Sequence, residues 1–229
     1  MTREAVTCSR CGIINIYPLP TRVSAEETPE LLKKVYDLTL FDWVCPACGH
    51  RMELDFKVHF TNKGHTLTMV YTPEKDATID GLLGDDGNPL RMDDFLRDLA
   101  HQRHEEGYKN AACRIVHHRL HFFEKALVFK HKLNDKVIEV MKLAATDRYK
   151  KDFPGKEAVL SIFVFKKTGY EIVVFDPEGN ASSIPVKKRD YRRTARLFRK
   201  TYGNIDPYEV CIDSKWVANL LFSHRKEEQ

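Results

Sequence analysis

The chain has 229 residues, 42% hydrophobic and 31% charged, which suits one globular core or two small ones. No apolar run approaches the ~20 residues of a membrane-spanning helix, and the first residues carry no apolar leader, so we exclude an integral membrane protein and expect a cytoplasmic one. Residues 1–73 carry 8 basic and 8 acidic side chains, residues 74–186 carry 18 and 19, and residues 187–229 carry 11 and 6, so the positive surplus lies in the tail region.

Two matched cysteine pairs stand near the start of the chain, Cys8-x2-Cys11 and Cys45-x2-Cys48, and a glycine follows each pair directly. β-prone residues flank both pairs, which indicates two hairpins with a cysteine pair at each turn. In the last strand the apolar residues alternate with polar ones, so one of its faces should meet a core. The predicted strands are residues 5–7, 13–17, 41–44 and 51–60.

A helix is expected between the two hairpins. Thr28 suits an N-cap, proline follows it at the first helical position, and an apolar stripe continues, so residues 29–37 read as helical. Residues 66–71 predict one more strand, and residues 72–89, rich in Asp, Gly and Pro, predict a flexible connection.

The cysteine spacing indicates a closed metal site. Two residues between paired cysteines make a short turn that aims both sulfurs at one point, and two such turns complete an S4 tetrahedron with no vacant position. Gly12 and Gly49 can take positive φ, which lets nearby backbone N–H groups point at the sulfurs. The predicted ligands are Cys8, Cys11, Cys45 and Cys48.

Zinc is the expected metal, and other interpretations remain open at this point. A rubredoxin-type iron site uses the same two turns. Paired disulfides are disfavoured because a reducing cytoplasm is expected and because Cys113 and Cys211 stand isolated. A thioredoxin-like redox pair is disfavoured because that motif occurs once, within a βαβ pattern.

The second half of the chain alternates helices with strands. A helix is expected over residues 92–107, a short strand over 112–116, and two helices with a break at residues 133–135. A β-meander follows. After it we expect a helix over 190–202, a strand over 208–212 and a last helix capped by Ser214. The meander strands are predicted over residues 159–165 and 171–175.

The helix near residue 190 is strongly basic. Its aromatic and small apolar residues fall along one side, so the cations should project from the other. Arginine side chains suit phosphate oxygens, and a dense cationic face attracts polyanions, so nucleic acid is a candidate partner. The alternative is a solvated helix face paired with acidic loops such as residues 80–86. The candidate contacts are Arg189, Arg192, Arg193, Arg196, Arg199 and Lys200, beside Lys187 and Lys188.

The chain resembles the bacterial CpXC family in four stretches. These are the paired cysteine turns, the helix beginning TPELLKKVYD, the segment FDWVCPACGH, and RIVHHRLHFFEKALVFKHKLNDKVIEVMK. The first pair departs from the family pattern because it lacks the proline that Pro46 supplies in the second. The resemblance implies a zinc-binding module with no established activity.

A second metal site is a further candidate. His101 and His104 stand three apart on a predicted helix near Asp94 and Asp98, which would suit a metal-dependent enzyme. No recognised motif accompanies them, and His117, His118 and His121 have none either. His50 follows the second pair directly and is expected to support a thiolate rather than to replace one.

We therefore expect an α+β protein that binds zinc structurally and acts as a non-enzymatic interaction module for an unknown macromolecule. Nucleic-acid binding through the basic helix is the alternative, and a metal-dependent enzyme the second alternative. The expected parts are a zinc-ribbon-like module over 1–73, a connection over 74–90, a helical segment over 91–153 and a β-meander with C-terminal helices over 154–229.

Overall fold

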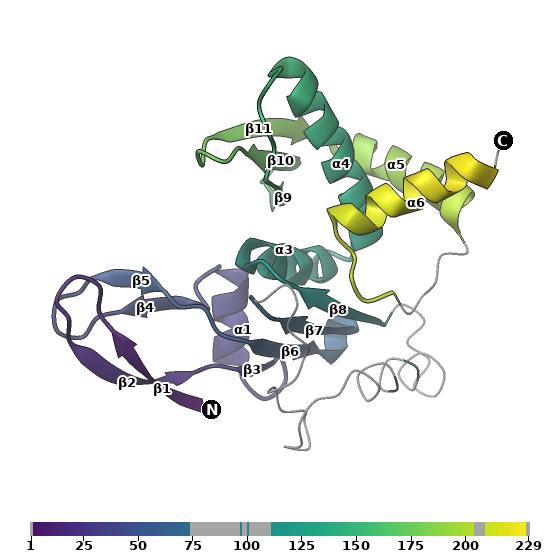
Figure 1. The fold of residues 1–229 in the computed structure, drawn as a ribbon. Helices are drawn as coiled ribbons and strands as arrows, with labels where there is room; N and C mark the ends of the chain where they lie inside the picture. Colours follow the sequence, from purple (N-terminus) through teal and green to yellow (C-terminus); the bar gives the residue numbers. More distant parts are fainter. Residues whose placement is uncertain (1, 74–96, 98–99, 101–110, 204–208, 228–229) are drawn as a thin grey trace. The chain divides into compact units, whose positions relative to one another are not determined.

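The computed structural model describes residues 2–73, 97, 100, 111–203 and 209–227. The chain forms two compact units, Met1–Leu127 and Val128–Gln229, and each is described by itself (Figure 1). Helices and small sheets occur in both units, which confirms the α+β class. The finer division at residues 73, 90 and 153 stays a prediction.

Two short antiparallel hairpins carry the cysteine pairs in the first unit. One joins β1 (Thr2–Thr7) to β2 (Ile14–Leu19), and the other joins β4 (Asp42–Val44) to β5 (Arg51–Glu53). Each has one face on a small core, because Val6 of β1 and Trp43 of β4 are buried. Both predicted hairpins are confirmed.

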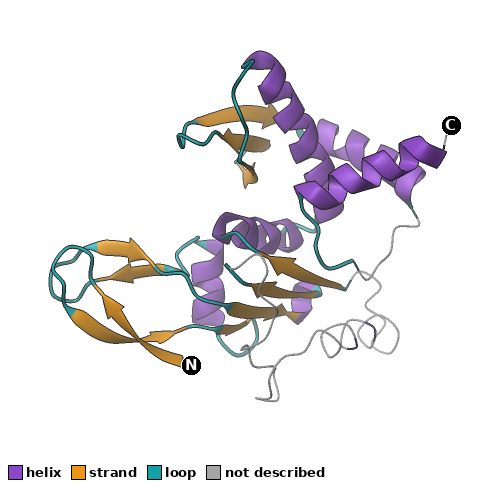
Figure 2. Ribbon diagram, in the orientation of Figure 1, coloured by secondary structure: helices purple, strands orange, loops and turns teal. Residues whose placement is uncertain are grey.

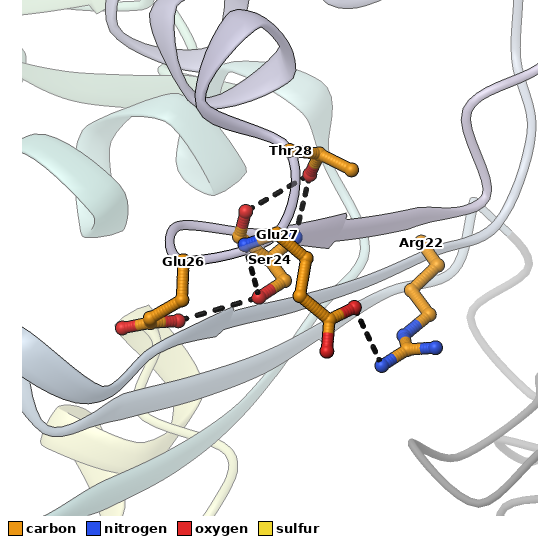
Figure 3. A network of polar contacts seen from close by, with 5 residues as sticks. All are labelled: Arg22, Ser24, Glu26, Glu27 and Thr28. Carbon is orange, nitrogen blue, oxygen red and sulfur yellow. Dashed lines mark hydrogen bonds and ion pairs between the residues drawn. The ribbon is translucent and has the colours of Figure 1, made fainter.

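The helix between the hairpins is α1 (Pro29–Tyr36), as predicted, but its start differs from the expected cap (Figure 3). Thr28 stands at the N-cap position, yet its hydroxyl does not cap the helix. Instead it accepts from the Ser24 N–H and donates to the Ser24 carbonyl, both at 2.9 Å. Ser24 Oγ accepts from the Glu27 N–H at 3.3 Å and donates to Glu26, and Glu27 pairs with Arg22 at 3.1 Å. The polar contacts therefore stabilise the turn from β3 (Arg22–Ser24) into the helix.

A four-stranded mixed sheet forms the larger core of the first unit. Its strand order is β3, β6 (Val58–Asn62), β7 (Leu67–Tyr71) and β8 (Ala112–Val116). β6 is antiparallel to β7, whereas β3 and β8 run parallel to their neighbours. The single strand expected over 51–60 is wrong: β5 ends at Glu53 in the hairpin, and β6 begins at Val58 in the sheet.

Aromatic rings fill this core. The helix α3 (Arg119–Lys130) brings Phe122 and Phe123 to within 5.8 Å of Phe41, measured between ring centroids. Phe122 also meets Phe60 of β6 and Tyr71 of β7, each at 5.9 Å. Burial of several rings together gives the first unit an apolar core apart from its hairpins.

Within its described residues, the second unit combines a three-stranded antiparallel meander with helices, as Figure 2 shows. The long helix α4 (Asp135–Asp152) packs against two of the strands and against both later helices. Its predicted separation from α3 is confirmed, and Asn134 caps it by accepting from the Lys136 N–H at 2.9 Å. The other elements are β9 (Leu160–Phe165), β10 (Tyr170–Phe175), β11 (Ala181–Val186), α5 (Lys188–Tyr202) and α6 (Ser214–Glu227).

Two details of the C-terminal region differ from expectation. Residues 209–212 are not a strand, although Val210 and Ile212 are β-branched. Asp213, not Ser214, caps α6, because its carboxylate accepts from the Trp216 N–H at 2.8 Å.

The helix expected over 92–107 and the connection over 72–89 lie almost wholly outside the described residues. Within the described residues, no helix has the length and apolar character needed to cross a membrane.

Candidate metal centre

Each cysteine pair folds into the same backbone turn. The Cys8 N–H donates to the Ile13 carbonyl and the Gly12 N–H donates to the Cys8 carbonyl, both at 2.9 Å. The second pair repeats this pattern: the Cys45 N–H donates to the His50 carbonyl at 2.8 Å, and the next glycine donates to the Cys45 carbonyl at 2.9 Å. Two equivalent turns on separate hairpins therefore present their sulfurs in the same way.

Glycine is needed in both turns for its backbone conformation. Gly12 has φ +71° and Gly49 has φ +69°, a region that strains residues with a Cβ. A Cβ built at either position would meet no heavy atom within 4 Å, so space does not explain the residue choice. The positive φ predicted from the sequence is present in both turns.

The four sulfurs converge. The Sγ atoms of Cys8 and Cys48 lie 3.7 Å apart, as do those of Cys11 and Cys45, and all four lie within 4.8 Å of one another. A tetrahedron with metal–sulfur bonds of ~2.3 Å has sulfur–sulfur edges of about 3.8 Å. The cluster could therefore hold one metal ion.

The thiols affect one another's ionisation. The pKa of Cys8 is lowered to about 6: burial disfavours its thiolate, but the N–H groups of Cys11 and Arg10 and two neighbouring thiols stabilise it more. The pKa of Cys11 is raised to about 12, because burial and the three other thiols outweigh the Ile13 N–H that favours its thiolate. The Cys8 thiolate is therefore favoured and the Cys11 thiolate opposed, and a cation bound among the sulfurs would favour both thiolates.

A small apolar shell surrounds the cluster. Val6, Trp43 and the two buried cysteines, Cys8 and Cys45, form its core, and Met52 packs against it from β5. Sequence reasoning did not assign Trp43 or Val6 to the site. Their place two residues before each first cysteine, on strands that alternate in and out, was the available signal.

The sequence model described as CpXC protein matches residues 6–142, which covers more than half of the chain. The chain belongs to the CpXC family. Searches of curated proteins and of solved structures gave no match. This CpXC match includes all four clustered cysteines and ends inside α4, so α5 and α6 lie beyond it.

The histidines in the described ranges form no cluster of potential metal ligands. Among the residues that the structure describes, the four cysteines form the only group of three or more potential ligands. His50 takes part through its carbonyl. His117 contacts the Thr72 carbonyl through Nδ1 at 3.1 Å, and His118 accepts from the Leu120 N–H at 3.2 Å, so both have local structural contacts. His101, His104, Asp94 and Asp98 lie outside the described residues.

The other candidates are placed as follows. Cys113 is buried in β8, whereas Cys211 is exposed. The six candidate nucleic-acid contacts and Lys188 lie in the second unit, on α5, and all seven residues are exposed.

Proposed function

We propose that the four cysteines hold one structural zinc ion and that the zinc-bound hairpins form a non-enzymatic module that binds a protein. The metal part rests on the sulfur positions, because two 3.7 Å separations match the edges of a zinc–thiolate tetrahedron. Four protein ligands leave no open coordination position for a substrate or water. A closed site of this kind serves folding rather than catalysis.

Zinc binding would supply stability that the hairpins lack. Their strands are three to six residues long, and their shared core has only a few buried side chains. Metal coordination to structural cysteine sites contributes ~10 kcal/mol or more of apparent binding free energy. The fold of the hairpins would therefore depend on the ion.

The binding role rests on an exposed apolar face of the first hairpin. Ile14 and Ile16 of β2 are 66% and 61% exposed. They stand opposite Thr7 and Ala5 of β1, on the face away from Val6 and the sulfurs. Adjacent exposed apolar side chains of this kind mark a candidate protein contact surface. Arg3 of β1 lies on the same face, but the two isoleucines offer apolar contacts, which fit a protein better than a nucleic acid.

Elemental analysis of the untreated protein tests the metal. We expect one zinc per chain and less than a tenth of that in Cys11→Ser and Cys45→Ser variants. Cys113→Ser is the matched control and should keep full metal. Iron in the wild-type protein would contradict zinc, and metal retained in both cysteine variants would contradict the site.

Photo-crosslinking in the producing cells tests the binding role. A photoreactive residue at position 14 or 16 should form an adduct with one protein, and the adduct should disappear in the Cys45→Ser background. Position 34, an exposed lysine on α1, serves as the control site. The purified partner should bind the Ile14→Asp variant at least tenfold more weakly. Equal adducts at all three positions, or unchanged affinity, would contradict the role.

A further inference from the structure

α5 has two faces of different chemistry. Its 15 residues include seven lysines and arginines and one acid, Asp190. At 100° per residue, the seven cations fall within an arc of about 140° that contains no other residue type. The arc consists of Lys188, Arg189, Arg192, Arg193, Arg196, Arg199 and Lys200.

The opposite face fixes the helix in the second unit. Phe198 is buried in the core of this unit, and Tyr191, Ala195 and Tyr202 pack against the same core. The Tyr191 hydroxyl also accepts from the Asn134 N–H at 2.9 Å, at the start of α4. The aromatic side holds the helix in place, so the cationic arc has a fixed outward orientation.

The arc has little internal neutralisation. All seven cationic residues are exposed. Within the described part of the chain, their one ion pair joins Arg189 to Asp190 at 3.7 Å, and Asp190 also accepts from the Lys187 N–H. The acidic loop over residues 80–86 lies outside the described residues. A concentrated, fixed cationic surface of this kind raises the local concentration of polyanions.

We propose that the cationic arc of α5 binds the phosphate backbone of double-stranded nucleic acid without regard to sequence. Five of the seven cations are arginines, whose planar fork fits phosphate oxygens with two hydrogen bonds. From residue 188 to residue 200 the helix rises about 18 Å, a length along which a duplex carries about ten phosphates. The spacing of charges therefore suits a duplex backbone.

Other polyanions fit less well. Proteins that bind single strands usually stack bases on exposed aromatic rings, and the aromatic residues of α5 face the core instead. A helix that binds a membrane surface inserts its apolar face. That face of α5 packs on the core, and Leu197 is the one large apolar residue of α5 that is exposed. This surface lies outside the CpXC match and does not depend on the proposed zinc function.

The test measures binding of the full-length, metal-loaded protein to a fluorescent duplex DNA of arbitrary sequence over a range of salt concentrations. We expect weak but measurable binding whose logarithm falls linearly with the logarithm of salt concentration. Replacing Arg192, Arg193 and Arg196 with alanine should reduce the affinity at low salt at least tenfold and the magnitude of the slope by about 3.

Two variants separate the arc from net charge. Arg148, Lys150 and Lys151 are three exposed cations on α4 of the same unit, and their triple alanine variant removes the same charge. It should bind almost as the wild type does. Replacing Arg192, Arg193 and Arg196 with lysine should preserve most of the dependence of affinity on salt concentration. Circular dichroism checks that each variant is folded.

Duplex RNA and vesicles of phosphatidylserine and phosphatidylcholine are compared in parallel. Binding of either duplex through the arc supports the proposal and identifies the source of the phosphates. An unchanged slope in the α5 alanine variant would overturn it, as would an equal loss in the α4 variant. Binding to vesicles or single strands without binding to duplexes would overturn it too.

Discussion

At the scale of single residues, the metal turns depend on two glycines. Because φ is near +70° at both, an alanine should cost about 1–2 kcal/mol through backbone strain alone. We predict that Gly12→Ala lowers the free energy of unfolding of the hairpins by this amount while the protein still binds one metal ion.

The fluorescence of Trp43, read in a Trp216→Phe background, measures this loss. Gly64→Ala is the control: φ at Gly64 is not positive, and a Cβ there would lie an ordinary 3.5 Å from Asn62 Oδ1. Equal effects at positions 12 and 64 would show that positive φ is not what the turn requires.

Asp176 supplies a second prediction at this scale. Its pKa is lowered to about 2. The Asn180 side-chain amide favours the carboxylate and burial opposes it, but the Asn180 N–H and Lys156 also favour the carboxylate. A depressed pKa contributes stability above the ordinary value of about 3.9, and this contribution is lost as the pH falls from there to about 2.

We therefore predict that Asp176→Asn destabilises the second unit at neutral pH and that its difference from the wild type disappears near pH 2. Urea unfolding followed by Trp216 fluorescence in a Trp43→Phe background measures this difference. The exposed Glu178→Gln should change little at any pH. A difference that stays constant with pH would contradict the role of the carboxylate.

At the scale of elements, the cap of α6 can be tested directly. The Asp213 carboxylate accepts from the Trp216 N–H, so Asp213→Ala should destabilise the second unit by about 1 kcal/mol. Ser214→Ala should have a much smaller effect. Thermal unfolding followed by circular dichroism compares the two variants, and the reverse order of effects would restore Ser214 as the cap.

Local elements were predictable from the sequence because their causes are local. The cysteine turns follow from the spacing of Cys8 and Cys11 and from Gly12, all within five residues. The break between α3 and α4 follows from Asn134, whose side chain caps the next helix. No contact with a distant segment is needed to explain either feature.

Elements that depend on distant partners were not predictable. The alternation from Met52 to Phe60 continues across β5 and β6, so the pattern conceals the point at which the chain leaves one sheet for another. β11 contains Pro185 and two serines, a weak strand pattern that is tolerated because β11 lies at the edge of its sheet. The run 209–212 looks like a strand but pairs with none in the described part of the chain.

At the scale of the whole molecule, each unit has a tryptophan of its own. Trp43 is buried beside the cysteine cluster, and Trp216 packs against the core of the second unit. Because metal binding is coupled to folding, a chelator should expose Trp43 and shift its emission to longer wavelength. We predict that Trp216 emission does not change.

Single-tryptophan variants, Trp216→Phe and Trp43→Phe, separate the two signals. Re-addition of zinc should reverse the change at Trp43. A simultaneous shift of both tryptophans would contradict metal-dependent folding confined to the hairpins, and so would no shift at Trp43.

The central claim is that sulfur from two hairpins coordinates one ion. X-ray absorption at the zinc edge measures this most directly, because it reports the type, number and distance of the ligand atoms. We predict four sulfur atoms at ~2.3 Å and no nitrogen or oxygen ligand. A mixed shell containing nitrogen or oxygen, or fewer than four sulfurs, would contradict the account.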